Sequence, residues 1–275
     1  MNSFFSLIIP VTVFLRFLIP TPILAAEIPG RIELAPHEWA KYRCRLKDSR
    51  NTRWEGTRIT ERQSVGPPPR YNIIYREEGL FGDENRHERR LGESAFELVD
   101  GRLRPLTSHA EIRDGQSRMI RTMEATFDYA GKTVRTRIAS PPNDTIETKE
   151  FDLEGPMIPG YEIWLLLRGF PYPGMVREGN ELTCEILTGK PASYSILFKH
   201  EEIEDVTTPA GTFSCHRLRL IPDLGILTWL GKLIAPTIYL WFTVEPPHNW
   251  IKYSGPESGP GTPGVVIELV ESGKK

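Results

Sequence analysis

Residues 206–220, VTTPAGTFSCHRLRL, join two stretches of alternating side chains through a short turn. Pro209 presets φ near about −65° and Gly211 tolerates a positive φ, so the chain reverses direction within a minimal length. Phe213 then restarts the strand on the side that we expect to face the core. Since no catalytic motif accompanies these three residues, we interpret the turn as structural. It predicts an antiparallel hairpin in which a slip of one residue would turn every side chain to the wrong face.

Similar signals recur in the N-terminal half of the chain. Between residues 94 and 140, three strand-like stretches end at Asp100-Gly101, Asp114-Gly115 and Ala130-Gly131. Asp-Gly favours a two-residue hairpin turn because glycine adopts positive φ at little cost. The segment GPPPR (66–70) interrupts the alternation because consecutive prolines cannot donate ladder hydrogen bonds. This spacing of turns predicts an antiparallel meander over residues 31–140.

Two apolar segments depart from the alternation. In IPGYEIWLLLRGF (158–170), apolar residues recur at helical spacing before Gly169 and Pro171, which predicts one short helix. The insert DLGILTWLGKLIAP (223–236) fits a helical face, and we expect it to cap the concave face of the sheet. The predicted fold is mainly β: a curved antiparallel sheet, or open half-barrel, wrapped round a short apolar helix, with the apolar insert at 223–236.

The 275 residues include 34 Lys and Arg against 36 Asp and Glu, so no global charge favours nucleic acid. Residues 1–26 carry one charged side chain, Arg16, and end in Ala25-Ala26, which is typical of a secretory signal peptide. An uncleaved membrane anchor is the alternative, although three prolines weaken a continuous helix. Cleavage predicts a periplasmic or secreted protein with no transmembrane span. Residues 27–275 would then form a single β-rich domain.

The order of elements over residues 150–272 carries a family resemblance. An apolar helix ends at Leu167-Arg168, the TPAGTF turn (208–213) follows, and WFTVEPPHNWIKY (241–253) precedes a terminal VIELVE. This part resembles an uncharacterised family of secreted bacterial domains of unknown function. Such domains are similar to the lipoprotein carriers LolA and LolB, which implies a curved sheet round a helix. The resemblance implies no catalytic residues.

The chemistry-bearing residues form no known catalytic motif. His109 with Glu111, and His200 with Glu202, could each share a strand face, but an exposed polar face explains both pairs more simply. We expect three buried thiols, with Cys184–Cys215 as the alternative disulfide. An Arg-rich N-terminal half is typical of a solvated outer sheet face, and contact with lipid phosphates is the alternative. The sequence therefore predicts no catalytic residue, metal or cofactor.

Aromatic and apolar side chains are the remaining functional signal. An open half-barrel has a mouth where such residues could contact an apolar or lipid-like ligand, or an envelope protein partner. The residues expected to bind this ligand are Trp164, Trp229, Leu230, Leu233 and Trp241. Three functions stay open: a non-catalytic binding protein, a purely structural envelope module, and a hydrolase with dispersed His and Glu residues. A cavity would favour the first, a packed interior the second, and a buried His/Glu cluster the third.

Overall fold

The structure is a computed structural model that describes residues 30–64, 66–141, 145–173, 180–187, 192–222, 237–259 and 261–275. The signal-like segment 1–26 and the apolar insert 223–236 lie outside the described residues. Both expectations about them therefore stay predictions.

The first half of the chain forms eight consecutive strands. They are β1 (His37–Leu46), β2 (Thr52–Ser64), β3 (Arg70–Phe81), β4 (Arg86–Val99), β5 (Arg102–Asp114), β6 (Met119–Asp128), β7 (Thr133–Ser140) and β8 (Thr145–Asp152). The second half contributes β9 (Met157–Pro159), β10 (Glu181–Leu187), β11 (Ser193–Thr208), β12 (Gly211–Pro222), β13 (Ile238–Thr243), β14 (Trp250–Pro256) and β15 (Gly264–Lys274). Between β9 and β10, a 3₁₀ turn η2 (Gly160–Glu162), the helix α1 (Ile163–Leu166) and a second 3₁₀ turn η3 (Leu167–Gly169) form one short helical segment.

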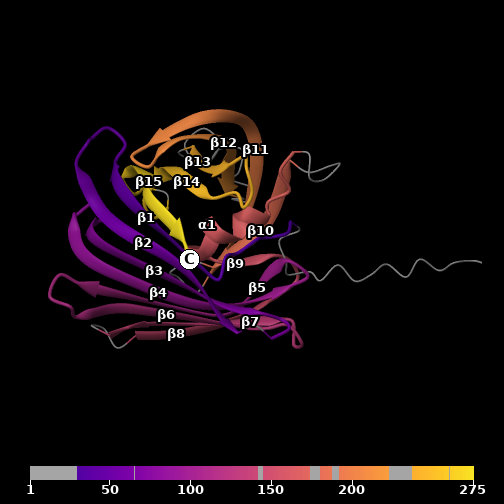
Figure 1. Ribbon diagram of the computed structural model, residues 1–275. Helices are drawn as coiled ribbons and strands as arrows, with labels where there is room; N and C mark the ends of the chain where they lie inside the picture. Colours follow the sequence, from indigo (N-terminus) through magenta and orange to yellow (C-terminus); the bar gives the residue numbers. More distant parts are fainter. Residues whose placement is uncertain are drawn as a thin grey trace, which may run out of the picture.

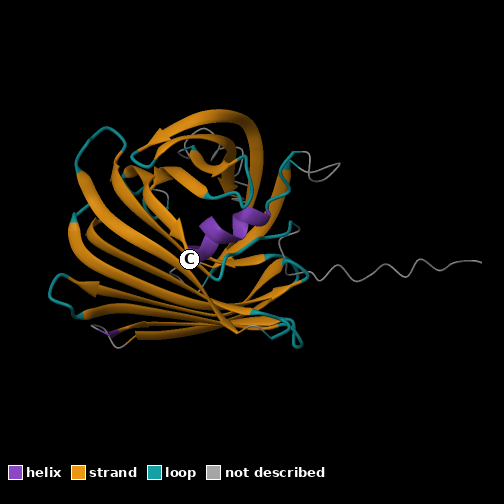
Figure 2. Cartoon of the chain, viewed as in Figure 1, coloured by secondary structure: helices purple, strands orange, loops and turns teal. Residues whose placement is uncertain are grey.

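All fifteen strands belong to one sheet, in the order β8-β7-β6-β5-β4-β3-β2-β1-β15-β14-β13-β12-β11-β10-β9. The chain runs from β1 outward to the edge strand β8, crosses to the opposite edge at β9, and returns to pair β15 with β1. Each described pair is antiparallel except β9 with β10. The sheet is curved and unclosed, and the helical segment lies within its curve (Figures 1 and 2). The predicted fold class is confirmed.

Alternation explains why these stretches become strands. In β7, Val134 and Ile138 are buried, while Arg135 and Arg137 between them are exposed and pair with glutamates of neighbouring strands. Residues two apart on a strand share a face, so one side of the sheet is buried and the other solvated. The strand β8 escaped prediction, because TIETKEFD is mostly exposed and polar and shows no apolar alternation.

The predicted turns are partly confirmed. Asp100 and Gly101 both have positive φ, 52° and 81°, and form the expected two-residue turn between β4 and β5. The same expectation is wrong for Asp114-Gly115, where four residues separate β5 from β6. The Asp114 carboxylate accepts hydrogen bonds from the backbone N–H of Gln116 and Arg118, at 2.9 and 3.0 Å. These bonds stabilise a longer loop in place of a two-residue turn.

The turn at Pro209 connects β11 to β12, with Thr208 paired to Gly211. Gly211 has φ of +132°, a conformation that side chains with a Cβ rarely adopt. Phe213 is partly buried and packs against the main core, as expected for the strand that follows the turn. The turn therefore joins β11 to β12, and the register of this hairpin starts from the pairing of Thr208 with Gly211.

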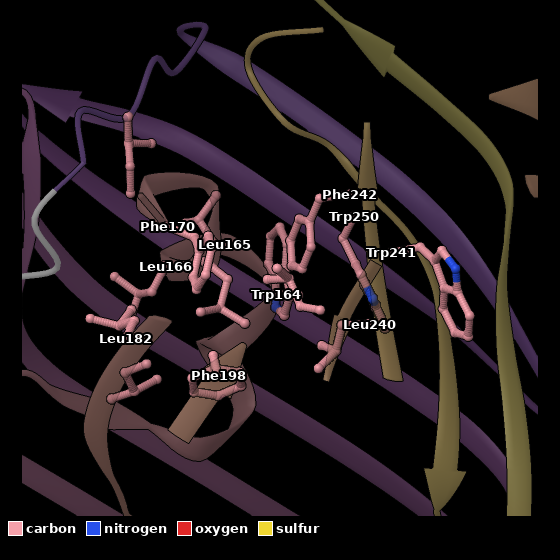
Figure 3. Packing of buried hydrophobic residues seen from close by; sticks show 14 of the residues in the cluster. Trp164, Leu165, Leu166, Phe170, Leu182, Phe198, Leu240, Trp241, Phe242 and Trp250 are labelled. Atoms are coloured by element: carbon pink, nitrogen blue, oxygen red, sulfur yellow. The ribbon is translucent and has the colours of Figure 1, made fainter. Parts of the chain in front are cut away.

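The main core lies between the helical segment and the C-terminal strands. Leu165, Leu167 and Phe170 are fully buried and form one cluster with the side chains of Phe198 and Phe242 (Figure 3). Gly169 and Pro171 end the helical segment, as the sequence predicted. This part of the curved sheet is therefore filled with protein side chains.

Candidate functional site

A cavity of about 250 Å³ lies where the first and last strands of the chain pair, at the seam between β1 and β15. We call it the seam cavity. Its lining comes from β1, β2, β14, β15, the helical segment and the residue before β14. The lining residues are Glu38, Trp39, Ala40, Tyr42, Arg58, Thr60, Trp164, Arg168, Asn249, Trp250, Leu269, Ser272, Gly273 and Lys274.

Aromatic rings form much of the inner wall of the seam cavity. The rings of Tyr42 and Trp250 lie with centroids 4.4 Å apart, and the Tyr42 hydroxyl donates to the Trp250 carbonyl oxygen at 2.9 Å. Trp164, on α1, is 5% exposed and belongs to the same core cluster (Figure 3). Burial raises the pKa of Tyr42, so its hydroxyl stays protonated at neutral pH. The wall is rigid because these side chains are held by the core.

A buried ion pair closes one side of the seam cavity. Arg168 Nη1 donates to Glu38 Oε2 at 2.7 Å, and both side chains are about 7% exposed. Arg168 Nη2 donates to Asn249 Oδ1 at 3.0 Å. The residue Arg168 is the one charged side chain in the apolar stretch IWLLLRGF, and a buried charge needs a partner. That isolated charge was the signal by which sequence reasoning could have found this site.

A second buried pair lies behind Tyr42. Arg58 on β2 donates through Nη2 to the Glu77 carboxylate, and its guanidinium lies over the rings of Tyr42 and Tyr75, at 6.0 and 5.3 Å. Nearby, Ser94 donates to the carboxylate of Glu162, which is 1% exposed. Burial raises the pKa of Glu162 to about 7.

The described cavity and the buried pairs contain none of the expected His/Glu sites. His109 and Glu111 lie 3.4 Å apart on an exposed part of β5. A bulge separates His200 from Glu202, and Glu202 instead pairs with Arg217 at 2.6 Å. The first pair therefore lies on a polar, partly exposed face, as the simpler interpretation had it, whereas the second pair does not form because His200 contacts His216 instead.

Three histidines gather elsewhere, where β12 meets the segment after the helix. His200 Nε2 and His216 Nδ1 lie 3.0 Å apart, and Tyr172 stacks on both His216 and His248, with centroids 4.4 Å away in each case. The His248 Nδ1–H donates to the Thr243 carbonyl oxygen at 2.9 Å. Burial lowers the pKa of His216 to about 4, so it is neutral at pH 7. Within the described residues no group of three or more His, Cys, Asp or Glu could hold a metal ion.

Of the five residues expected to bind a ligand, the structure describes Trp164 and Trp241, and both belong to the main core cluster. Trp164 lines the seam cavity. Trp241 does not line the seam cavity. It pairs across the sheet with Arg217 and Lys252, and its indole N–H donates to Glu204 at 2.7 Å. In Figure 3 its ring points away from Trp164. Trp229, Leu230 and Leu233 lie outside the described residues, so their role stays a prediction.

The remaining polar expectations have simple structural outcomes. Cys44, Cys184 and Cys215 are free and buried, as expected, and burial raises the pKa of both Cys184 and Cys215 to about 12. The Arg-rich N-terminal half forms cross-strand ion pairs on the outer face, such as Arg43 with Glu55 at 3.1 Å. These pairs fit a solvated sheet face.

The fold and the seam cavity define a class of protein: an open half-barrel domain with an internal helical segment. The chain belongs to the family described as "Protein of unknown function (DUF3108)", which it matches over residues 89–253. The family is uncharacterised, as the sequence resemblance predicted. No curated protein matches the chain.

Two solved structures are similar at low identity. One is a protein of Bacteroides fragilis described as a candidate exported protein with a YmcC-like fold, at 10% identity and a TM-score of 0.38, over 91% of this chain and 100% of that one. The other is a candidate lipoprotein of Parabacteroides distasonis, at 9% identity and a TM-score of 0.36, over 90% of this chain and 99% of that one. In the described part of this chain, no helix has the length and apolar character needed to cross a membrane.

Proposed function

We propose that the protein is an exported, non-catalytic binding domain that holds a small ligand in the seam cavity. The observation that supports this proposal is a cavity of about 250 Å³ with aromatic and charged walls between the sheet and the helical segment. Small-molecule sites typically combine aromatic walls with a few fixed polar groups. Export rests on the signal-like residues 1–26, and we place the mature protein in the periplasm or outside the cell.

The size of the seam cavity limits the ligand. Drug-sized ligands occupy pockets of roughly 300–1,000 Å³, and the seam cavity lies just below this range. A complete lipid with two acyl chains needs more room than this. We therefore propose a compact ligand, or the head of a longer one, in place of the larger lipid-like molecule that the sequence suggested.

A purely structural envelope module is the second candidate. The interior round Leu165, Phe170 and Phe198 is fully packed, as the structural hypothesis requires. The histidine cluster likewise packs Tyr172 against His216 of β12. A seam cavity that binds no ligand would support this structural function.

Native mass spectrometry of protein purified from its own cell envelope separates the two candidates. We expect a bound small molecule on the wild-type chain. Ala40 lines the seam cavity, so Ala40→Trp should fill it and remove the adduct. The matched control is Ala130→Trp, in the exposed turn between β6 and β7, which should keep it. If the wild type carries no adduct, or if a folded Ala40→Trp protein keeps it, the binding function is wrong. Ala40→Leu serves if the larger variant fails to fold.

A further inference from the structure

Three buried N–H groups belonging to side chains that line the seam cavity have no acceptor among the described residues. They are Arg58 Nε, Arg168 Nε and Trp164 Nε1. Buried polar groups in folded proteins are nearly always hydrogen-bonded, so three in one place require an explanation. Each of these residues is at most 6% exposed.

The other hydrogen bonds of the two arginines show that they are held in place. Arg168 uses Nη1 for Glu38 and Nη2 for Asn249. Arg58 uses Nη2 for Glu77, and its Nη1 lies 3.4 Å from the Thr57 carbonyl oxygen. Each guanidinium is therefore fixed by its outer nitrogens, while Nε is left over. A guanidinium that is already positioned loses little entropy when it binds another acceptor.

The three unpaired groups are all donors. The other unpaired side-chain atoms that can accept a hydrogen bond, among them Glu162 Oε2, His248 Nε2 and His37 Nδ1, belong to residues that do not line the seam cavity. A ligand that satisfies the cavity must therefore bring acceptor atoms. Carboxylate and phosphate oxygens accept from arginine more strongly than neutral groups do.

The charge of the lining favours the same chemistry. Arg58, Arg168 and Lys274 line the seam cavity beside the carboxylate of Glu38, and Glu77 pairs with Arg58 behind it, so three positive charges stand against two negative ones. The Glu38 carboxylate already accepts from Arg168 and from the Ala35 backbone N–H, at 2.7 and 2.8 Å. An added anion would therefore meet one positive charge in excess, beside two buried guanidinium groups.

We propose that the seam cavity binds a small anion: a carboxylate or phosphate group attached to a compact apolar body. The anionic group accepts hydrogen bonds from Arg58, Arg168 and Trp164, and the rings of Tyr42 and Trp250 contact the apolar body. This inference rests on the proposed binding function and adds the chemical class of the ligand.

Matched pairs of probes test the charge separately from the shape. The full-length mature protein is titrated by calorimetry with indole-3-acetate and indole-3-acetamide, and with phenyl phosphate and phenol. We expect the anion of at least one pair to bind at least tenfold more tightly than its neutral partner. The pair that shows the difference identifies the anion as carboxylate or phosphate, and inorganic phosphate alone shows whether the apolar body contributes.

Two tryptophan variants test the geometry. Trp164→Phe removes one of the unpaired N–H groups and should weaken binding of the anion about tenfold, the effect of one hydrogen bond to a charged group. Trp250→Phe is the matched control. The Trp250 N–H already donates to the Lys252 carbonyl oxygen at 3.0 Å. Trp250→Phe should therefore lower the affinity for the anionic probe no more than the affinity for its neutral partner.

The outcomes separate the two proposals. Equal binding of the anionic and neutral probes, or an equal change in the preference for the anion in the two tryptophan variants, would overturn the inference and leave the binding function intact. A neutral native adduct, identified by its accurate mass, would do the same. The absence of both a native adduct and any probe binding would overturn both proposals.

Discussion

The buried pair of Glu38 and Arg168 should be among the most costly interactions to break. The two residues are 130 positions apart, and their pairing joins β1 to the helical segment. We consider Glu38→Leu, which removes the carboxylate at similar volume. The Arg168 guanidinium, about 7% exposed, would then keep Asn249 as its acceptor and lose its counter-charge.

The magnitude follows from what each variant leaves behind. Removing one partner of a buried ion pair costs about 3–5 kcal/mol, because the other charge stays buried. Arg168→Met should cost less, about 2–3 kcal/mol, since Glu38 keeps the Ala35 N–H at 2.8 Å and Lys274 at 4.0 Å. The double variant should cost less than the sum of the two, because an apolar pair needs no counter-charge.

Urea unfolding followed by tryptophan fluorescence gives the free energy of unfolding of each variant. The melting temperature should fall by about 10 °C for Glu38→Leu. Lys41→Leu is the control. It breaks an ion pair with Glu271 of 3.0 Å whose side chains are more than half exposed, and should change stability by less than about 1 kcal/mol. A Glu38→Leu protein within about 1 kcal/mol of the wild type, or strict additivity in the double variant, would refute the reasoning.

Three further predictions concern backbone strain and pH. Gly211→Val should destabilise the fold by about 1–3 kcal/mol because φ is +132°, whereas Gly66→Val, in open space, should change the melting temperature little. His216 has a folded pKa of about 4 against an ordinary 6.5, so the folded state prefers the neutral ring. Its contribution to stability is present above pH 6.5 and lost as pH falls to 4. His216→Phe should therefore make the free energy of unfolding less dependent on pH between 4 and 6.5. Glu162 has the opposite sign: its folded pKa of about 7 lies above the ordinary 4.5, so its contribution is present below pH 4.5 and lost as pH rises through 7. Glu162→Gln should remove that loss, and an unchanged pH profile of stability in either variant would contradict the assignment.

The candidate site was only partly predictable from the sequence. The helical spacing round Trp164 placed it on a buried apolar segment, and the structure puts it in the cavity wall. The same reasoning grouped Trp241 with it, because both are aromatic and lie in the C-terminal half. Trp241 belongs to the same core cluster as Trp164, but it pairs across the sheet with Arg217 and does not line the seam cavity. Shared composition does not predict a shared cavity.

By itself, the sequence determined the local structure. Alternation with a period of two specified the strands, the Asp100-Gly101 and Pro209–Gly211 turns specified hairpins, and the apolar run before Gly169 specified the short helical segment. These features depend on backbone sterics and on neighbours within a few residues, so a local pattern is enough to encode them. The mainly β, curved and open fold followed from them.

Only the tertiary structure determines which distant residues line the seam cavity. The seam cavity exists because β15 pairs with β1, which places Lys274 opposite Glu38 and brings Arg168 to the same carboxylate. No local pattern specifies such a pairing, since its partners lie at opposite ends of the sequence. The role of an arginine in an apolar run depends on tertiary contacts, because the folded chain both supplies its counter-charge and buries it away from water.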